Sequence, residues 1–338
     1  MAVEKGTISI QLVGEALLEA RRLGLDVSLL LQRAGISEEL LSRPCSRLPS
    51  QLFGQLWRTL AEEMDDEFFG MNARRMKTGS FAFMCTSALS EPTLGRATER
   101  ALAFLGLVLD GLNPRLTYQG GLAEIVLDEP DAQHSRAFAY FTLWLMVHGL
   151  LCWLAGRRIP ILGIDLRCAE PGYVEDYRVM FCDTLRFERS RSRLLLNADF
   201  LQQPVRRDDR ELRRFLAGAP ANILVRYRDP QSLGGRVRTH LRLLSVELWP
   251  DFKTLSGQFH MAPSTLRRKL AQEGQSFQGL KDQVRRELAI ARLDAGEENL
   301  DELSDTLGFA DASAFYKAFR KWTGSTPGQY RALLRSEG

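Results

Sequence analysis

Two groups of basic side chains near the C-terminal end of the chain have the chemistry needed to contact nucleic acid. Arg267, Arg268 and Lys269 are consecutive, and residues 312–336 contain five further Lys or Arg residues and no Asp or Glu. These groups bind phosphate, and an arginine can also donate two hydrogen bonds to the O6 and N7 atoms of guanine. Such local charge makes DNA a candidate partner, whereas the net charge of +3 is too small to indicate one.

The charge is also unevenly divided along the 338 residues. Residues 231–338 contain 16 Lys and Arg and 13 Asp and Glu, which gives this part the whole net charge of +3. Residues 1–230 contain 29 residues of each sign. We therefore expect the C-terminal part to bind the polyanion.

The elements that must position these basic side chains have the pattern of two helix-turn-helix units, at about 252–273 and about 300–323. Each combines an amphipathic helix, a tight turn and a second helix with basic residues beside an apolar stripe. The second helix of such a unit enters the DNA major groove. Two generic helical hairpins are the alternative interpretation.

Equivalent apolar positions recur in the two units at a nearly constant offset. Leu255 and Leu303 are 48 residues apart, whereas Leu266 and Phe315 are 49 apart. This offset indicates a diverged repeat with one residue inserted at the second turn.

A single helix is expected to join the two units, over about residues 276–295. Ser276 is a suitable N-cap, and helical spacing relates the apolar positions Phe277, Leu280, Val284, Leu288 and Ala291. About 19 residues make a rod near 30 Å long, close to one DNA turn of about 34 Å. We also expect Asn299 and Glu302 to form a capping box, and Gly308 to end a helix in the left-handed conformation.

Six segments of this region share a recognisable pattern, namely Thr265–Gly274, Ser276–Phe277, Val284–Ala289, Leu307–Phe309, Ser313–Gly324 and Thr326–Arg331. Together they resemble the DNA-binding domain of AraC/XylS-type transcription regulators. The resemblance implies that two recognition helices lie in successive major grooves. It assigns base reading to Ser264, Arg267, Arg268, Ser313 and Lys317. It favours phosphate contacts for Thr265, Lys269, Tyr316, Arg320 and Lys321.

The chain departs from the family at two helix caps. The family usually has Ser before Pro263 and at the matching place in the second unit, where this chain has Ala262 and Ala310. Loss of a Ser cap typically costs about 1 kcal/mol. Asp311 or Ser264 are the residues that could compensate.

The fold class is expected to be mainly α. An N-terminal α+β domain, 1–218, precedes a linker, 219–234, and an all-α DNA-binding domain, 235–338, whose first helix runs from Gly235 to Trp249. In the N-terminal domain, periodicity predicts four helices and the strands of a small sheet. The helices are Ile10–Leu23, Ser50–Met64, Phe81–Leu89 and Thr93–Leu109, and the strands are a hairpin at 115–128 with Ile161–Arg167 and Leu185–Leu196.

Two short motifs suggest a role for this N-terminal domain. Residues Glu91–Ala97 and Asp183–Phe187 look like parts of the arabinose-binding-like domain of one branch of the same family. That resemblance implies a homodimer that senses a small-molecule effector of unknown identity. A domain that only dimerises and binds no ligand is the alternative.

Residues 137–156 form an apolar segment without Asp, Glu, Lys or Arg, long enough to span a bilayer. A membrane-anchored regulator is therefore an alternative, but we favour a helix that is apolar because it is buried on all sides. This helix is also where we expect an effector pocket, and the residues that could line the pocket are Tyr140, Trp144, His148 and Trp153.

An enzyme is not expected. The five cysteines have no Cys-x-x-Cys spacing and none adjoins a histidine, and no Walker loop, dinucleotide fingerprint or metal motif occurs. Residues 1–10 have no apolar core of a signal sequence. We therefore expect a cytoplasmic, dimeric, effector-responsive transcription regulator without cofactor or metal. It would bind promoter DNA and RNA polymerase, and activation is the commoner action in the family.

Overall fold

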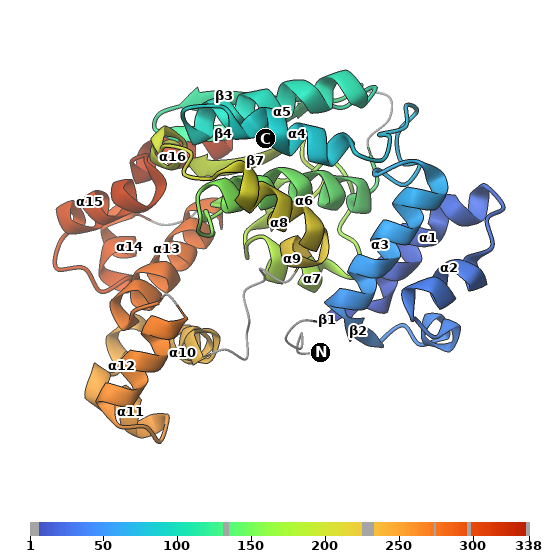
Figure 1. The fold of residues 1–338 in the computed structure, drawn as a ribbon. Coiled ribbons are helices and arrows are strands. Elements are labelled where there is room, and N and C mark those ends of the chain that lie inside the picture. The colour runs from blue at the N-terminus through green and yellow to red at the C-terminus, as the bar shows by residue number, and fades with distance from the viewer. Residues whose placement is uncertain (1–6, 131–134, 225–232, 274, 296–298, 336–338) are drawn as a thin grey trace. The chain divides into compact units, whose positions relative to one another are not determined.

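The computed structural model describes residues 7–130, 135–224, 233–273, 275–295 and 299–335. The chain divides into two compact units between residues 227 and 228. As the sequence predicts, the first is α+β and the second is all helical (Figure 1). The expected linker, 219–234, includes the short helix α9 (Ala221–Leu224), and its residues 225–232 lie outside the described part of the chain. The domain boundaries themselves remain a prediction.

Helices make up most of the N-terminal unit, and the four that periodicity predicts are present to within one residue at either end. The α-helices are α1 (Ile10–Arg22), α2 (Val27–Ala34), α3 (Ser50–Met64), α4 (Ser80–Leu89), α5 (Leu94–Val108), α6 (Ala137–Leu154), α7 (Val174–Met180), α8 (Asp209–Gly218) and α9. Two 3-10 helices, η1 (Glu38–Ser42) and η2 (Ala198–Gln202), complete the set.

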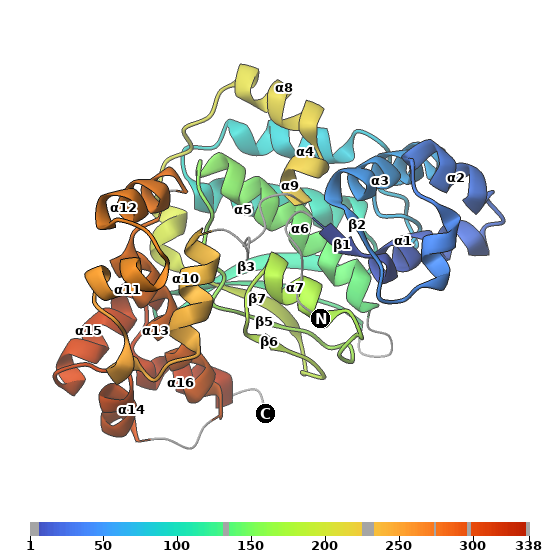
Figure 2. The same ribbon diagram turned by 90° about the horizontal axis from the view of Figure 1, so that it is seen from below.

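Two sheets complete this unit. The smaller one pairs β1 (Thr7–Ser9) with β2 (Arg47–Pro49). The larger one has the order β3 (Asn113–Gln119), β4 (Leu122–Asp128), β7 (Ser192–Asn197), β5 (Gly163–Asp165) and β6 (Leu185–Arg186). Figure 2 labels β3, β7, β5 and β6 of this sheet. Only the β5–β6 pair is parallel. The predicted hairpin is confirmed, because β3 and β4 turn at Gly120 and Gly121, both with positive φ.

The prediction of one strand over Leu185–Leu196 is wrong. The segment forms two strands, β6 and β7, which lie on either side of β5 but are not adjacent to each other. Between them Glu188 adopts a φ of 55°, and its N–H donates to the carbonyl of Cys168 at 3.0 Å. This left-handed residue turns the chain out of the ladder. The strand predicted over Ile161–Arg167 is present but shorter, as β5.

The core of the N-terminal unit is organised around α6, whose 18 residues are all buried. It contacts α1, α4, α5 and α9, so it has no face left for solvent. By length and composition, α6 is the one helix in the described ranges that could cross a membrane. Its burial on all sides matches the favoured interpretation of a core helix.

A buried network of charged groups ties the larger sheet together. Arg193 on β7 is 1% exposed and donates to Asp165 on β5 at 2.6 Å and to Glu124 on β4 at 3.0 Å. Arg186 on β6 also pairs with Asp165. Four adjacent strands are thus joined by two guanidinium groups and two carboxylates of balanced charge, which is a favourable arrangement for buried ions.

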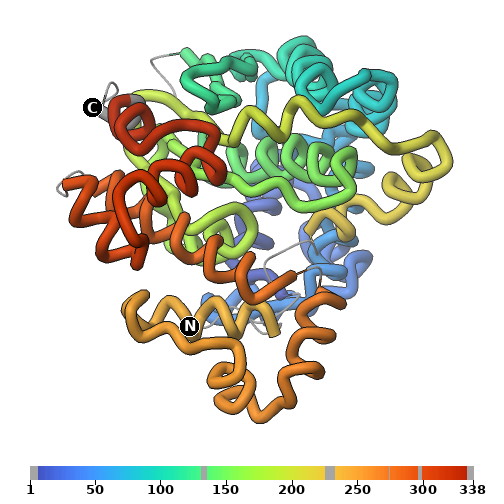
Figure 3. The backbone as a smooth tube through the Cα atoms, turned by 90° about the vertical axis from the view of Figure 1, so that its left-hand side faces the viewer, coloured from blue at the N-terminus to red at the C-terminus, as the bar shows by residue number. Residues whose placement is uncertain are grey.

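The C-terminal unit contains α10 (Leu233–Arg242), η3 (Val246–Leu248), α11 (Phe252–Gln258), α12 (Pro263–Gln272), α13 (Phe277–Ala295), α14 (Leu300–Thr306), α15 (Ala312–Thr323) and α16 (Pro327–Arg335). One apolar cluster joins α10, α11, α12 and the first half of α13, through residues such as Leu241, Leu255 and Leu266. Figure 3 traces this unit in orange and red, with α13 as the connection between its two helical groups.

The helix predicted over Gly235–Trp249 is shorter than expected, because α10 ends at Arg242 and the 3-10 turn η3 follows. The folded-back chain lets Trp249 Nε1 donate to the carbonyl of Leu241 at 2.8 Å. That bond satisfies one of the carbonyls left open at a helix C-terminus.

Candidate nucleic-acid interface

The predicted base-reading residues lie on the exposed faces of α12 and α15, which are the second helices of the two helix-turn-helix units. Ser264, Arg267 and Arg268 follow one another at spacings of three and one on α12, and all are exposed. Ser313 and Lys317, one turn apart on α15, are exposed as well. The opposite faces are anchored by the buried residues Leu266 and Leu270 on α12 and by Phe315 and Phe319 on α15.

The two arginines of α12 differ in their surroundings. The Arg267 guanidinium lies over the ring of Phe252 on α11, 5.3 Å from its centroid. Arg268 makes no hydrogen bond or ion pair with the described part of the chain. Arg268 can place its donors on a base edge without giving up a contact, whereas Arg267 would have to leave the ring of Phe252, so Arg268 is better suited to base reading.

The predicted phosphate contacts surround these positions. Lys269 and Arg320 are exposed, as is Lys321, whereas Thr265 and Tyr316 are half-buried. Their positions flank the base-reading face on each helix, as side chains that grip the backbone of a groove would.

The N-caps of the two recognition helices differ, and the structure corrects the sequence comparison of them. Ala262 is the N-cap of α12 and provides no side-chain hydrogen bond, as predicted. The N-cap of α15 is Asp311, not the neighbouring Ala310, and its carboxylate accepts from the N–H of Ala314 at 2.7 Å. The offset of 49 that relates Leu266 to Phe315 also relates Ala262 to Asp311, so the second unit has kept its cap.

The long helix α13 joins the two units, and its 19 residues correspond to about 28 Å. Ser276 accepts from the N–H of Gly279 at 3.1 Å, which confirms the predicted cap. The apolar stripe differs from the prediction in its second half, where Ala291 is exposed and Ile290 and Leu293 are buried. The first half of α13 packs into the apolar cluster of the first helix-turn-helix unit. The helix also contacts α16, and in its second half a different face is buried.

Arg285 on α13 contacts Trp249, which packs on the apolar cluster of the first helix-turn-helix unit, and the turn of the second unit. Its guanidinium lies 5.2 Å from the ring centroid of Trp249 and 5.3 Å from that of Phe309, and its Nε donates to the carbonyl of Leu307 at 3.0 Å. Gly308, left-handed as predicted with φ of 68°, leaves room for Val246, whose Cγ1 would be 2.9 Å from an added Cβ. These contacts hold the turn between α14 and α15 against α13 and against the segment before α11.

The start of the second unit is only partly as predicted. Asn299 accepts from the N–H of Asp301 at 3.2 Å, so it caps α14. Asn299 therefore caps α14 through the second N–H of the helix, and neither bond of the capping box predicted with Glu302 occurs among the described residues.

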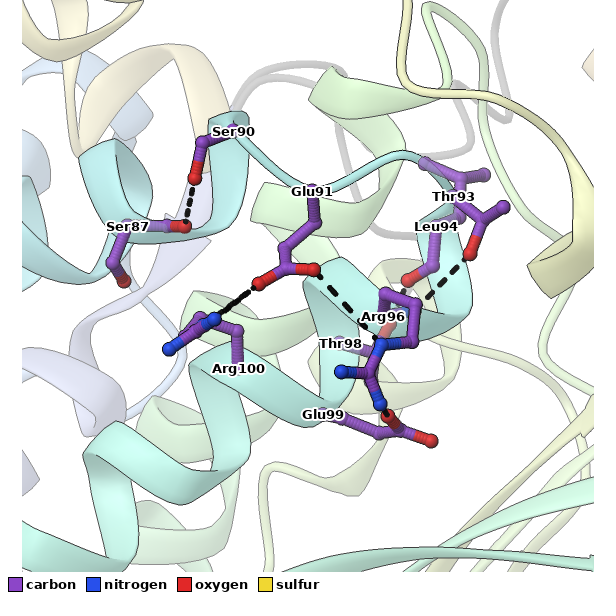
Figure 4. A network of polar contacts seen from close by, with 9 residues as sticks. All are labelled: Ser87, Ser90, Glu91, Thr93, Leu94, Arg96, Thr98, Glu99 and Arg100. Atoms are coloured by element: carbon purple, nitrogen blue, oxygen red, sulfur yellow. Dashed lines mark hydrogen bonds and ion pairs between the residues drawn. The ribbon is translucent and has the colours of Figure 1, made fainter.

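In the N-terminal unit, the motif Glu91–Ala97 builds the start of α5 (Figure 4). The Glu91 carboxylate pairs with Arg100 at 2.6 Å, and the Thr93 side chain caps the helix by accepting from the N–H of Arg96. Thr93 also bridges to Pro204, and the N–H of Leu94 donates to the carbonyl of Gln203. The motif is therefore structural, because it holds α5 against the segment that follows η2.

Comparison with protein families decides the identity of both units. Residues 24–205, more than half of the chain, match the model described as the arabinose-binding domain of AraC transcription regulators. Residues 255–333 match a helix-turn-helix domain. This chain belongs to the AraC family of transcription regulators. It is a DNA-binding regulator, its partner is double-stranded DNA, and its relatives are regulators rather than enzymes.

Individual relatives agree with this assignment. The ornithine utilization regulator of Pseudomonas aeruginosa is 26% identical over 320 residues, which cover 94% of each chain. The regulator VqsM of the same species is 35% identical over 117 residues, 34% of this chain and 35% of that one. The solved structure of the P. aeruginosa regulator CdpR is 19% identical over 96% of this chain and 97% of that one, with a TM-score of 0.31, too low for further argument.

The four aromatic and histidine residues predicted to line an effector pocket of this AraC-family regulator are all buried on α6. Tyr140 donates to the Glu129 carboxylate at 2.7 Å, and Trp153 stacks on Phe215 with ring centroids 4.7 Å apart. His148 lines a small cavity among the described residues, whereas Tyr140, Trp144 and Trp153 line neither that cavity nor a larger one nearby.

The larger cavity has a volume of about 310 Å³ and lies among α3, α4, α6, α8 and α9. Its wall is mainly apolar, with Trp57, Ala61, Phe81, Ala82, Leu145, Met146, Leu216, Ala219, Pro220 and Ile223. Its polar groups include Arg58, Glu62, Glu67 and Thr78. Sequence reasoning missed this cavity because its wall comes from five separate elements, none with a local motif.

Glu67 is the most enclosed of these polar groups. Its two carboxylate oxygens accept from the N–H groups of Gly79 at 2.9 Å and Phe81 at 2.6 Å. Burial raises the pKa of Glu67, and the nearby carboxylates of Asp66 and Asp65 raise it further, against the two backbone bonds. Each oxygen retains a lone pair that a bound molecule could use. The described residues hold no cluster of His, Cys, Asp or Glu suited to a metal ion.

Proposed function

We propose that this AraC-family regulator reads two adjacent major grooves with the exposed faces of α12 and α15. Ser264, Arg267 and Arg268 would contact base edges in the first groove, and Ser313 and Lys317 in the second. The carrying observation is the exposure of these residues on two helices joined by the rod α13, which matches about one turn of DNA. Thr265, Lys269, Tyr316, Arg320 and Lys321 would hold the phosphates.

The test compares two arginines with different proposed roles. Arg268→Ala should cost about 1–3 kcal/mol on the preferred site and relax the sequence preference at one position. The matched variant Arg320→Ala should weaken binding to all sequences and reduce the salt slope by about 0.9. Genomic fragments selected by the full-length protein supply the site, and affinities are measured over a salt series. Equal losses for both variants on specific and random DNA would contradict these roles.

We further propose that the N-terminal unit binds a small-molecule effector in the 310 Å³ cavity. The volume is in the range of ligand sites, and a mainly apolar wall with a few polar groups is typical of them. Glu67 favours a molecule with an apolar body and a hydrogen-bond donor, an ammonium or hydroxyl group. Leu216, Ala219, Pro220 and Ile223 belong to the last described segment before residues 225–232, which would connect occupancy to the DNA-binding unit.

This proposal is tested by thermal shift with octylamine, 1-octanol and octanoate, which share one apolar length. Octylamine and octanol should stabilise the protein, and octanoate should not, since a carboxylate would face Glu67. Ornithine is included because one relative is a regulator of ornithine utilization. Ala82→Phe should fill the cavity and abolish the shift, whereas Thr86→Phe, exposed one turn along α4, should retain it. A shift that survives Ala82→Phe would place the ligand elsewhere.

We propose that two copies associate through the N-terminal unit, at an exposed apolar face of α4 and α5. Phe83 is 64% exposed and Leu107 is 73% exposed, and Phe83 lies 5.6 Å from the half-buried ring of Phe104. Exposed apolar side chains grouped in this way are typical of protein contacts. Sedimentation should show a dimer that Phe83→Glu converts to monomer and that Leu243→Glu, in the other unit, leaves intact.

Promoter binding in the cytoplasm and contact with RNA polymerase complete the proposed role. The family assignment supports both. Transcription in a purified system, with and without the regulator on a selected promoter, tests whether it activates.

A further inference from the structure

Cys152 and His148 form a side-chain pair on α6 that the DNA-binding function does not use. They are one helical turn apart, and the Cys152 Sγ lies 3.3 Å from His148 Nε2. Ile159 closes the group from the returning chain, because its N–H donates to Cys152 Sγ at 3.3 Å and its carbonyl lies 2.8 Å from His148 Nε2. The absence of a histidine beside any cysteine in the sequence was thus misleading, since a spacing of four joins them on a helix.

The contacts define where the hydrogens lie. A carbonyl oxygen only accepts, so the short contact with Ile159 requires a hydrogen on His148 Nε2. That hydrogen bonds to the carbonyl, so the Ile159 backbone N–H is the donor that reaches the sulfur, and the imidazole lies against the sulfur at 3.3 Å. Donors directed at sulfur stabilise a thiolate, the reactive form of cysteine.

The electrostatics distinguish Cys152 from two other buried cysteines, Cys85 and Cys168. Burial by itself raises the pKa of Cys152, but the charge and hydrogen bond of His148, the Ile159 N–H and the charge of Arg158 outweigh it and leave the pKa below its ordinary value. Burial raises the pKa of Cys168 to about 12 and that of Cys85 further. The same kind of burial thus gives inert thiols elsewhere in this unit.

A small cavity opens onto this pair. Its volume is about 30 Å³, and it is lined by residues including His148, Cys152, Arg158, Phe181 and Ile223. A cavity needs about 10–15 Å³ to hold one water, so this one admits a molecule of two heavy atoms but not a bulky one. Hydrogen peroxide has this size, and the positive charge of Arg158 favours the departure of a hydroxide ion.

We propose that Cys152, assisted by His148, is a peroxide-reactive thiol site that modulates DNA binding. The thiolate attacks one oxygen of hydrogen peroxide, so that an S–O bond forms and the O–O bond breaks. The sulfur is oxidised to sulfenic acid, and the leaving hydroxide takes the proton that the thiol gave up and becomes water. The peroxide is reduced in the same two-electron step, and no other reactant is needed.

The place of Ile223 explains how oxidation would reach the other unit. Ile223 belongs to α9 and packs so closely on α6 that a Cβ added to Gly149 would lie 2.4 Å from its Cγ2. The oxygen added to Cys152 would occupy the small cavity that Ile223 helps to line, which places a new polar group against α9. From α9 the chain continues through residues 225–232 to the DNA-binding unit.

The test uses full-length protein carrying Cys45→Ser, because Cys45 is the exposed thiol. Hydrogen peroxide is added for increasing times, and a denaturing quench with dimedone traps sulfenic acid for peptide mass spectrometry. Each pKa unit changes the thiolate fraction about tenfold, so Cys152 should react at least about tenfold faster than Cys168 and Cys85 in the same molecules. His148→Gln should reduce the rate to that of the other two. Cys152 reacting no faster than Cys85 would overturn the proposal.

A second experiment leaves the pocket residues unchanged, so it does not depend on whether a pocket variant folds. In the unsubstituted pocket, tert-butyl hydroperoxide is too large for the cavity and should oxidise Cys152 far more slowly than hydrogen peroxide; equal rates would show that the cavity is not the route. Peroxide should also change the affinity for the selected DNA site, and Cys152→Ser should remove that change. Unchanged affinity after complete oxidation of Cys152 would refute the modulation of DNA binding.

Discussion

The N-cap of α12 provides a quantitative prediction about the first recognition helix. Ala262 has φ of −64° and ψ of 145°, the extended conformation that an N-cap adopts, but it has no side-chain oxygen. Pro263 has no N–H, and the N–H of Leu266 bonds to the carbonyl of Ala262. The N–H groups of Ser264 and Thr265 are thus left without a partner inside the helix.

Ala262→Ser should supply the missing acceptor without any change in the backbone. A Ser in place of Ala at an N-cap contributes about 1 kcal/mol, which corresponds to an opening of the first helical turn that is about fivefold less frequent. Hydrogen exchange, followed by mass spectrometry on the full chain, measures this opening for peptides from α12. Peptides from α15 in the same molecule serve as the reference.

The second unit supplies the matched controls. Asp311→Ala should speed exchange at the start of α15 by a similar factor, because it removes the 2.7 Å bond to Ala314, and Asp311→Asn should preserve protection. Ala310→Ser should have no effect, since residue 310 lies outside the cap. If Ala310→Ser protected α15, or if Ala262→Ser left α12 unchanged, the assignment of the caps would be wrong.

Three further predictions concern contacts within one or the other of the two compact units. Arg285→Leu should weaken binding to DNA with both boxes but not to a single box in a gel-shift assay, because Arg285 contacts both Trp249, which packs on the first helix-turn-helix unit, and Phe309 in the turn of the second. Arg193→Met should cost about 3–5 kcal/mol in urea unfolding of the sheet, since it removes one of the two buried guanidinium groups that balance Asp165 and Glu124, and Arg193→Met with Glu124→Leu should recover part of that loss. Gly149→Ala should lower stability by about 1–3 kcal/mol in calorimetry, because its Cβ would meet Ile223, whereas Gly14→Ala in α1, with nothing within 4 Å, should raise it. A stabilised Gly149→Ala or an additive double variant would contradict the packing and the charge network, respectively.

The helical part of the fold could be predicted because its signal is local. The boundaries of α3, and those of the β3–β4 hairpin, follow from periodicity and from Gly120 and Gly121. The repeat offset also predicts the N-cap of α15, because the residue 49 positions after Ala262 is Asp311 rather than Ala310.

Other features depend on residues that are distant in sequence, and no local pattern reveals them. The β6–β7 break follows from Glu188, whose N–H bonds to the carbonyl of Cys168. The charge network of Glu124, Asp165 and Arg193 joins three strands that are far apart in the chain. For the DNA-binding site, the sequence predicted the helices and their exposed faces. It could not show that the Arg267 guanidinium lies over the ring of Phe252.

For the apolar segment 137–156, composition does not distinguish a core helix from a membrane-spanning helix. A helix buried in protein and a helix buried in lipid both lack charged residues, so α6 satisfies the length and composition of either. The difference lies in the partners of its polar groups. Tyr140 donates to Glu129 and His148 contacts the carbonyl of Ile159, and both partners belong to segments of this unit outside the helix. Thr142, by contrast, donates to the carbonyl of Phe138 within α6 and would be equally satisfied in lipid. Tyr140 and His148 are thus explained by a protein surround, and His148 is in place to activate the thiol beside it.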